Sequence, residues 1–280
     1  MKTNYHTHTD FCDGAETPEA MVQAALEKQF DVLGFSGHSM YPFAADWHIA
    51  PRAHADYVQE IHRLADVYRD RIEILCGFEV DYLPGISVPH PSQFAPFKPD
   101  FLIGSVHYIV TDSGNFTVDD TAENVRAGIE RCFGGNAREA VCTYFSLERD
   151  LLREATCTFL GHCDLFRKRN GVLHLFDERD SWYRDELRAT ATAIAHSGVI
   201  VEINTGAITR GAMDDVYPSA EFLSLLAERG VPITISSDAH RGTDLDGAFD
   251  RAVRAAKAAG YTEMLLLTSG RITSQKLPTW

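Results

Sequence analysis

Short apolar runs alternate along the chain with longer segments in which apolar residues recur every three or four positions. The short runs are typical of buried strands, and the longer segments are typical of amphipathic helices that cover them. We predict strands at 2–6, 31–36, 72–79, 101–107, 158–162, 199–204, 232–236 and 264–267. We predict helices at 17–28, 51–70, 121–154, 180–197, 218–229 and 243–259, with Thr17 and Ser219 as N-caps of two of them.

A strand followed by a helix recurs at least six times in this order, which favours a mainly parallel sheet and suggests a barrel. The polar residues with metal-binding side chains fall at the C-terminal ends of the predicted strands, where a barrel gathers its catalytic groups. A doubly wound open sheet also binds ligands at that edge, but it more typically carries a Gly-rich phosphate loop, which this sequence lacks. No linker or low-complexity stretch divides the chain, so we predict a single α/β domain over residues 1–280.

Composition narrows the function classes. Of the 280 residues, 45% are hydrophobic, which is enough for a sizeable core, and the net charge of −14 repels nucleic acids and favours a small substrate with positive charge. No apolar run approaches the roughly 18 residues of a membrane span, so we expect a cytoplasmic protein without a membrane partner. The six cysteines form no C-x-x-C pair, which argues against a disulfide framework or a zinc finger.

The first strand is predicted to end in two histidines that face the same way. His6 and His8 are two positions apart, so both imidazoles point to one face of a strand and can address one metal ion. Asp13 follows after a short turn. An H-x-H segment alone is equally consistent with ordinary surface histidines, but its place after a strand favours a metal site.

Three more metal-capable side chains each follow an apolar run: His38, Glu79 and His107. Glu79 is the most informative, because an unpaired charge at the end of so apolar a strand costs several kcal/mol. It therefore needs a partner of opposite charge.

The second half of the chain adds His162, Asp238 and His240, again after predicted strands. Nine candidate ligands at successive strand ends make a coincidence of core histidines and loop acids improbable. Nitrogen and oxygen ligands without thiolates suit zinc, manganese or iron, and the sequence does not choose among them.

These motifs, in this order, resemble the polymerase and histidinol phosphatase (PHP) family: H-x-H, G-x-x-x-H, G-x-E, S-V-H, G-H-x-D and S-D-A-H. The resemblance spans nearly the whole chain and implies a distorted TIM-like barrel of seven strand-helix units, (β/α)7, with three divalent metal ions. It implies that the first ion is bound by His6, His8, Glu79 and Asp238, the second by Glu79, His107 and His162, and the third by Asp13, His38 and His240.

Longer stretches resemble the histidinol-phosphate phosphatase branch of that family: 79–85, 161–168 and 202–205, the last followed by Arg210. The resemblance implies a phosphoric monoester hydrolase that converts L-histidinol phosphate and water into L-histidinol and phosphate, a step of histidine biosynthesis. Two places depart from the pattern. Gly37 stands where the family often has an acidic partner for the following histidine, which puts the affinity for the third metal in question, and residues 115–120 do not match the branch.

Hydrolysis of a phosphate monoester requires charge neutralisation and a hydroxide at neutral pH, and clustered metals provide both. We expect a metal-bound hydroxide to attack phosphorus in line, with Asp238 or His240 moving protons. Arg167 and Arg210 are the expected phosphate-binding residues, because a guanidinium offers a planar fork to oxyanions, and Lys168 is a weaker candidate.

Two alternatives remain. The first is another PHP activity: a protein-tyrosine phosphatase, a nucleotide phosphatase or an exonuclease, the last disfavoured by the acidic charge. The second is a barrel that serves as a non-catalytic scaffold, which the nine competent ligand positions argue against. The sequence leaves the oligomeric state open.

Overall fold

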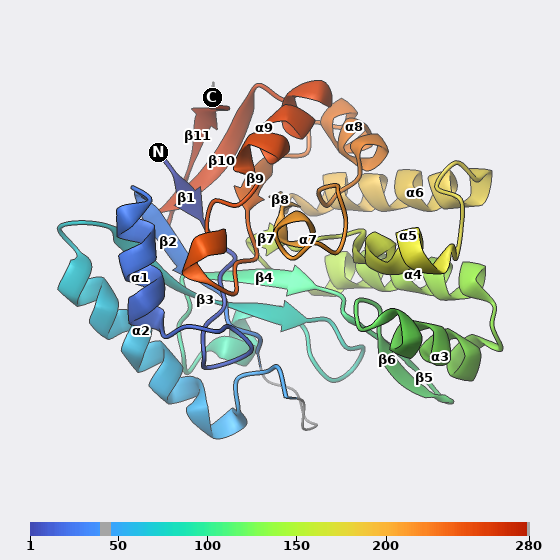
Figure 1. The fold of residues 1–280 in the computed structure, drawn as a ribbon, viewed down its shortest axis with the longest axis horizontal. Helices are drawn as coiled ribbons and strands as arrows, with labels where there is room; N and C mark the ends of the chain where they lie inside the picture. The colour runs from blue at the N-terminus through green and yellow to red at the C-terminus, as the bar shows by residue number, and fades with distance from the viewer. Residues whose placement is uncertain (40–45, 279–280) are drawn as a thin grey trace.

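A computed structural model of the chain describes residues 1–39 and 46–278. Seven parallel strands form a nearly closed barrel in the order β1-β2-β3-β4-β7-β8-β9, at the centre of Figure 1. A parallel bridge between Thr7 and Ala239 joins the segments that follow the first and last of these strands. The expected barrel of seven parallel strands is therefore confirmed. Its strands are β1 (Thr3–Asn4), β2 (Val32–Phe35), β3 (Glu73–Asp81), β4 (Phe101–Ser105), β7 (Phe159–Leu160), β8 (Ile200–Asn204) and β9 (Ile233–Ser236).

Helices surround the barrel, with α1 and α2 on one side of Figure 1 and α3, α4 and α6 on the other. The α-helices are α1 (Pro18–Glu27), α2 (His54–Tyr68), α3 (Ala122–Phe133), α4 (Ala137–Glu154), α5 (Asn170–Leu173), α6 (Ser181–Ser197), α7 (Gly206–Thr209), α8 (Ala220–Glu228) and α9 (Phe249–Ala258). Short 3₁₀ helices are η1 (Pro51–Ala53), η2 (Pro91–Phe94), η3 (Leu165–Arg169) and η4 (Gly242–Asp244). None of the described helices is long and apolar enough to span a membrane.

Both predicted N-caps are confirmed. The Thr17 side chain accepts a hydrogen bond from the backbone N–H of Ala20, and Ser219 accepts one from Phe222. Each cap satisfies one of the backbone donors that the first turn of a helix leaves without a partner.

The single helix predicted over 121–154 is wrong, because the structure has two helices there, α3 and α4. Gly134 ends α3 with a φ of 57°, a left-handed conformation that glycine adopts without steric cost. Asn136 then caps α4 by accepting a hydrogen bond from the backbone of Glu139. The apolar period continues through the break, but Gly134-Gly135-Asn136 is a helix-end signal that the sequence analysis did not use.

The predicted strand at 264–267 exists but does not belong to the barrel. It lies in β10 (Glu263–Thr268), which pairs in antiparallel fashion with β11 (Arg271–Lys276), a strand that the sequence analysis missed. Leu267 of β10 exchanges hydrogen bonds with the Tyr5 hydroxyl, which is buried next to β1. The hairpin therefore packs against the barrel instead of extending it.

Aromatic rings fill the barrel on the side of that hairpin. Tyr5 stacks on Phe159 with ring centroids 4.9 Å apart and meets Phe101 edge-on at 6.1 Å. These apolar side chains occupy one part of the interior, and the polar residues gather beyond the C-terminal ends of the strands. A second hairpin that the sequence analysis missed, β5 (Tyr108–Thr111) with β6 (Gly114–Thr117), follows β4.

Candidate metal centre and substrate cavity

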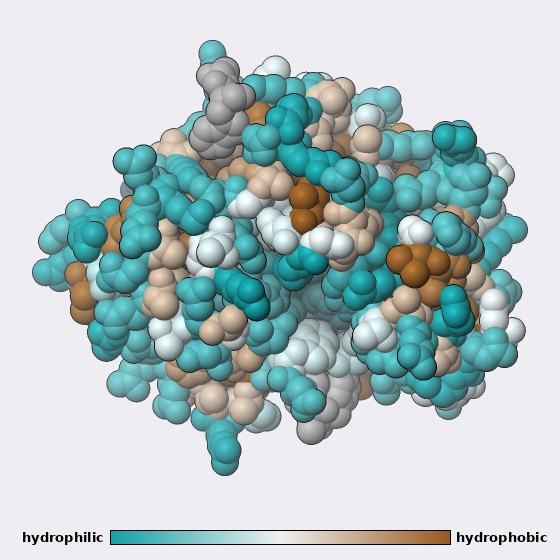
Figure 2. All heavy atoms as spheres, in the orientation of Figure 1, coloured by the Kyte–Doolittle hydropathy of each residue, from teal (hydrophilic) through white to brown (hydrophobic). Residues whose placement is uncertain are grey.

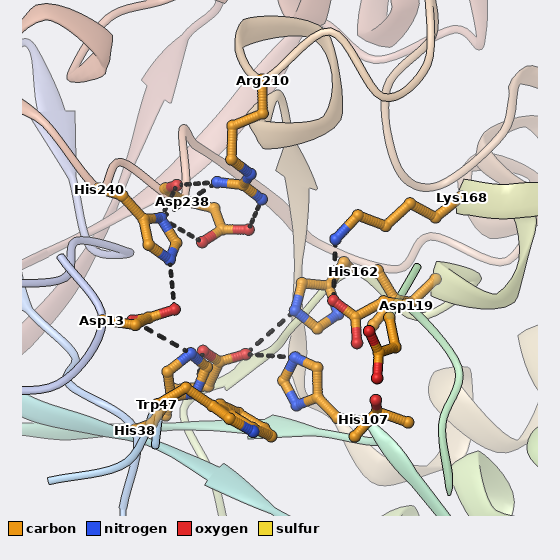
Figure 3. Close-up of a pocket in the computed structure, with 14 residues that line it drawn as sticks. Asp13, His38, Trp47, His107, Asp119, His162, Lys168, Arg210, Asp238 and His240 are labelled. Atoms are coloured by element: carbon orange, nitrogen blue, oxygen red, sulfur yellow. Dashed lines mark hydrogen bonds and ion pairs between the residues drawn. The ribbon is translucent and has the colours of Figure 1, made fainter. Parts of the chain in front are cut away.

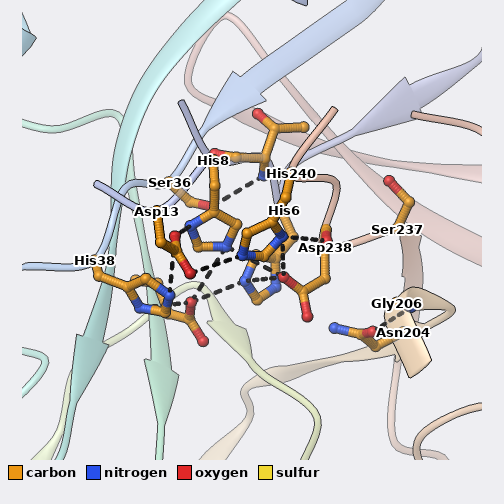
Figure 4. Close-up of polar contacts among 12 residues, drawn as sticks. His6, His8, Asp13, Ser36, His38, Asn204, Gly206, Ser237, Asp238 and His240 are labelled. Atoms are coloured by element: carbon orange, nitrogen blue, oxygen red, sulfur yellow. Dashed lines mark hydrogen bonds and ion pairs between the residues drawn. The ribbon is translucent and has the colours of Figure 1, made fainter. Parts of the chain in front are cut away.

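All nine predicted ligands lie together beyond the C-terminal ends of the barrel strands, although they are spread over most of the sequence (Figures 3 and 4). Their ligand atoms form four overlapping groups in which every atom lies within 4.8 Å of the others. The groups are His6 with His8 and Asp238; His6 with Glu79 and His162; His38 with Glu79 and His107; and His8 with Asp13, His38 and His240.

Glu79, on β3, lies at the centre of this cluster and is 1% exposed. Its Oε2 lies 3.0 Å from Nε2 of His6 and 3.1 Å from Nδ1 of His38. Its Oε1 lies 3.0 Å from Nε2 of His162 and 3.6 Å from Nε2 of His107. Nε2 of His8 also lies 3.5 Å from Oε2. One carboxylate therefore faces five imidazoles from four different parts of the chain, as a bridging ligand would.

Asp238 approaches the cluster from the end of β9. Its Oδ1 lies 3.2 Å from Nε2 of His8 and 3.7 Å from Nε2 of His6. Its Oδ2 is paired with Arg210, whose Nη2 lies 2.7 Å away. The two oxygens of this carboxylate thus serve different neighbours.

Asp13 and His240 form the most exposed part of the cluster. Nε2 of His240 lies 3.0 Å from Oδ2 of Asp13, and Oδ1 of Asp13 lies 3.8 Å from Nε2 of His38. His8 also faces this group, with Nδ1 3.6 Å from Oδ1 of Asp13. The set inferred from the resemblance, Asp13 with His38 and His240, is thus brought together with His8 beside it.

The charges of this cluster suit bound cations. Burial opposes ionisation of Glu79, but His6 and the other histidines outweigh it and hold the pKa of Glu79 well below its usual range. Burial likewise opposes ionisation of Asp238, but Arg210 and His6 hold the pKa of Asp238 well below normal. Burial lowers the pKa of His38 to about 3 and also lowers the pKa of His8. The ionised carboxylates and the neutral rings of His8 and His38 are thus in the forms that bind metals. At three other histidines of this cluster, burial is outweighed by neighbouring carboxylates, which raise the pKa of His6, His107 and His240 in the absence of a bound cation.

Two ring nitrogens test whether the residues fit metal ions. Among the described residues, the buried Nε2 of His8 and Nδ1 of His38 have no hydrogen-bond partner, although each faces a carboxylate oxygen little more than 3 Å away. Buried polar atoms are rarely left in this state, and a cation between nitrogen and oxygen would satisfy both. The residues therefore fit the divalent ions that the resemblance implies.

A cavity of about 390 Å³ opens beside this cluster, and the space-filling view shows a hydrophilic hollow near its centre (Figure 2). Most of the predicted ligands line it, together with the cationic side chains of Lys168 and Arg210.

Seven of the nine predicted ligands line this cavity. They are Asp13, His38, Glu79, His107, His162, Asp238 and His240, and the other lining residues are Trp47, Thr117, Asp119, Asp120, Leu165, Lys168 and Arg210. His6 and His8 lie behind this wall, fully buried.

Arg167, predicted to bind phosphate, is not among the residues that line the cavity. Its guanidinium is buried and paired with three carboxylates, with Nη2 2.8 Å from Asp215, Nε 3.1 Å from Glu178 and Nη1 3.4 Å from Asp164. Nη1 also donates to the carbonyl oxygen of Val216. These contacts occupy the guanidinium N–H groups that the sequence analysis expected to bind phosphate.

The segment that departs from the family pattern reaches the cavity. Asp119 lies on its wall and accepts a hydrogen bond from Nζ of Lys168 at 2.8 Å (Figure 3). Arg169 donates to the backbone carbonyl oxygens of Asp119 and Asp120, which ties this loop to η3. The sequence analysis missed Asp119 as a cavity residue, because nothing in a loop sequence indicates which strand ends it will face.

A side chain at Gly37, where the family often has an acidic residue, would require the end of the Ile49 side chain to shift. A Cβ at this position would lie 2.7 Å from Cδ1 of Ile49. His38 meets the Trp47 ring edge-on, with centroids 4.6 Å apart. The His38 ring therefore has this aromatic contact in addition to its contacts with Glu79 and Asp13.

Two buried carboxylates outside the nine ligands contact ligand histidines. Asp81 accepts from Nδ1 of His107 at 2.8 Å, and Glu202 lies 2.9 Å from Nδ1 of His6. The sequence analysis did not assign these contacts. Glu202 could have been recognised from the sequence, because it is a charged residue inside an apolar strand, as Glu79 is.

Known proteins with similar sequences point to the same family as the motifs. The sequence model of the PHP domain matches residues 4–206. A protein of Deinococcus radiodurans named "Probable histidinol-phosphatase" is 30% identical over 91% of this chain and 92% of its own length. The histidinol-phosphatase of Bacillus subtilis is 24% identical over 89% of this chain and 97% of its own length.

Solved structures share the fold. The histidinol phosphate phosphatase of Lactococcus lactis, solved with zinc, L-histidinol and phosphate, aligns with a TM-score of 0.69 over 97% of this chain and 98% of its own. A Listeria monocytogenes protein aligns with a TM-score of 0.78 over 89% of this chain and 99% of its own. Both are 22% identical to this chain, so they show the fold alone.

Proposed function

The chain belongs to the PHP domain family, and from that premise we propose that it is a metal-dependent phosphoric monoester hydrolase whose substrate is L-histidinol phosphate. The observation that carries the proposal is the arrangement around Glu79. Nine metal-capable side chains converge there, and a cavity with two cationic side chains opens beside them. The names of the relatives and the L-histidinol in the Lactococcus lactis structure support the choice of substrate.

The nine ligands are proposed to hold up to three divalent ions, with Glu79 shared between two of them. Zinc, manganese and iron all suit this donor set, and the zinc in the Lactococcus lactis structure favours zinc. Divalent ions held there would supply Lewis acidity, which withdraws charge from a phosphate and makes water more acidic.

Arg210 and Lys168 are proposed to bind the phosphate from the cavity wall. Both line the cavity, and both are already held by carboxylates, Arg210 by Asp238 and Lys168 by Asp119. These ion pairs orient the cationic groups before the substrate arrives, which reduces the entropy that binding must offset. Arg167 is left out of this role because its guanidinium is occupied by Asp164, Glu178 and Asp215.

The leaving group is proposed to lie toward Trp47 and Asp120, which line the same cavity. A leaving group with an amine and an imidazole would place positive charge near the Asp120 carboxylate, in keeping with the acidic character of the chain. Asp238 and His240 are proposed to move protons, because both lie on the cavity wall beside Arg210.

The test is a set of steady-state rates on protein whose metal content is measured in the same sample. We expect L-histidinol phosphate to exceed phosphotyrosine peptides, nucleoside monophosphates and p-nitrophenyl phosphate in kcat/KM, and exhaustive chelation to abolish hydrolysis of all of them. A preference for phosphotyrosine or a nucleotide would support another PHP activity. A metal-loaded protein that hydrolyses none of these esters would support the scaffold alternative.

A further inference from the structure

Glu202 is a buried carboxylate on β8, 1% exposed, that is not one of the nine proposed ligands. Its two oxygens lie 3.0 and 2.9 Å from Nδ1 of His6. An ionised carboxylate only accepts hydrogen bonds, so this contact places the proton of a neutral His6 ring on Nδ1. Nε2 is then the nitrogen with a free lone pair, and it is the atom that faces Glu79 at 3.0 Å.

The same carboxylate also holds His162. The backbone N–H of His162 donates to Oε1 of Glu202 at 2.9 Å. The Nε2 atoms of His6 and His162 lie 3.0 Å from different oxygens of Glu79, and these three residues form one of the four candidate metal-binding groups. Glu202 therefore contacts two of the three members of that group, His6 and His162, at atoms other than the Nε2 atoms that face Glu79.

A third contact connects this carboxylate to the phosphate side of the cavity. Nδ2 of Asn204 donates to Oε1 of Glu202 at 2.8 Å. Oδ1 of the same side chain accepts from the backbone N–H of Gly206 (Figure 4). Gly206 begins α7, and Arg210 follows directly after that helix. Side chains of one strand thus reach both the metal-facing histidines and the segment that carries Arg210.

We propose that Glu202 is a positioning residue that fixes His6 and His162 for a metal ion shared with Glu79. The inference rests on the proposed function, since it requires that the centre bind metal. A buried ionised carboxylate is costly, and an apolar residue would suit this apolar strand without that cost. The contacts with two ligand histidines explain why a carboxylate stands there.

Replacement by glutamine separates this role from simple packing, because the amide has nearly the same shape but only one acceptor oxygen. Glu202 receives hydrogen bonds from His6, His162 and Asn204. In Glu202→Gln at least one of these donors faces an amide N–H group instead of an acceptor. Loss of such a partner typically weakens metal binding by roughly 10- to 100-fold.

The experiment measures zinc affinity by competition with a chromophoric chelator, and metal content by elemental analysis, for wild type, Glu202→Gln and Glu148→Gln. Glu148 is the matched control, since it is a fully buried glutamate that accepts from Tyr144 and contacts none of the nine ligands by hydrogen bond or ion pair among the described residues. We expect Glu202→Gln to bind one zinc ion 10- to 100-fold more weakly, and Glu148→Gln to match wild type. Added zinc should also raise the Tm of Glu202→Gln less than it raises the Tm of wild type.

Equal zinc affinities for wild type and Glu202→Gln would overturn the inference while leaving the proposed function intact. Wild type that binds no divalent metal would instead overturn the proposed function. If Glu202→Gln does not fold, nitrogen NMR of ¹⁵N-histidine-labelled, zinc-loaded wild type decides the matter. We expect His6 to carry its proton on Nδ1, and a proton on Nε2 would overturn the inference.

Discussion

Arg210 and Asp238 form an ion pair at the edge of the cavity, with Nη2 of the guanidinium 2.7 Å from Oδ2 of the carboxylate (Figure 3). Oδ1 of the same carboxylate lies 3.2 Å from Nε2 of His8, inside the candidate metal centre. Asp238 thus joins the proposed phosphate-binding side to the metal-binding side. The sequence analysis treated these as separate, whereas the pair links them.

Arg210→Ala should therefore lower both substrate affinity and metal affinity. A charge-assisted contact contributes roughly 1.5–3 kcal/mol, so kcat/KM should fall by about 10- to 100-fold. Lys at this position should restore only part of the activity, because an ammonium lacks the two-pronged geometry. Steady-state kinetics with metal analysis checks this, and kcat/KM within about twofold of wild type would contradict it.

Lys168→Met should lower kcat/KM by about 10- to 100-fold at unchanged metal content, because Lys168 contacts none of the nine ligands by hydrogen bond or ion pair in the described chain. Lys28→Met is the matched control, since Lys28 pairs with Asp246, away from the cavity lining. The control should keep kcat/KM within about twofold. Equal changes of kcat/KM in the two variants would show that Lys168 does not bind the substrate phosphate.

Arg167→Met should destabilise the fold instead of weakening substrate binding directly. It leaves Asp164, which is fully buried, without its guanidinium, and breaking a buried pair in this way costs about 3–5 kcal/mol. Chemical unfolding measures the loss. Arg254→Met, which removes an exposed pair with Asp250, should cost about 0–1 kcal/mol. A large rise in KM with unchanged stability would contradict this prediction and indicate that Arg167 binds the substrate phosphate.

Glu79→Gln should lose more metal than Asp13→Asn. Glu79 faces five imidazoles, and a neutral amide cannot balance the charge of two ions, whereas Asp13 lies at the exposed margin of the cluster. Elemental analysis of both variants, purified in parallel, gives the comparison. Wild-type metal content and turnover in Glu79→Gln would refute the bridging role.

Glu148 should make stability depend on pH. Burial raises the pKa of Glu148 from 4.5 to about 8, although the hydrogen bond from Tyr144 opposes that rise. A raised carboxyl pKa means that the folded state prefers the protonated form. The contribution of Glu148 is fully present below pH 4.5 and is lost progressively as pH rises to about 8 and beyond.

Between pH 6 and pH 9, the unfolding free energy of wild type should therefore fall more than that of Glu148→Gln, by an amount on the order of a few kcal/mol. Glutamine keeps an oxygen that accepts from Tyr144 and has no charge to bury. Urea unfolding at several pH values checks the difference. Parallel curves for the two proteins would show that Glu148 does not titrate in this range.

Most strands of the barrel could be predicted from the sequence because they are local apolar runs, although β1 consists of two polar residues, Thr3 and Asn4. Glu79, His107 and His162 were recognisable as ligands for the same reason, since each ends such a run and would be costly there without a partner. The hairpin of β5 and β6 was missed because each strand has only four residues and the apolar β5 directly follows the predicted strand at 101–107. The break between α3 and α4 was missed because the apolar period was given more weight than the local signal Gly134-Gly135-Asn136.

The sequence by itself determined which residue types stand at the strand ends, and with them the metal-binding character of the chain. Only the tertiary structure decided which partner each charged group meets. Arg167 and Arg210 look alike in sequence, yet one is enclosed by Asp164, Glu178 and Asp215 and the other reaches the cavity. The physical reason is that ion pairs and hydrogen bonds depend on distances of a few ångströms between segments far apart in sequence, and the fold alone sets those distances.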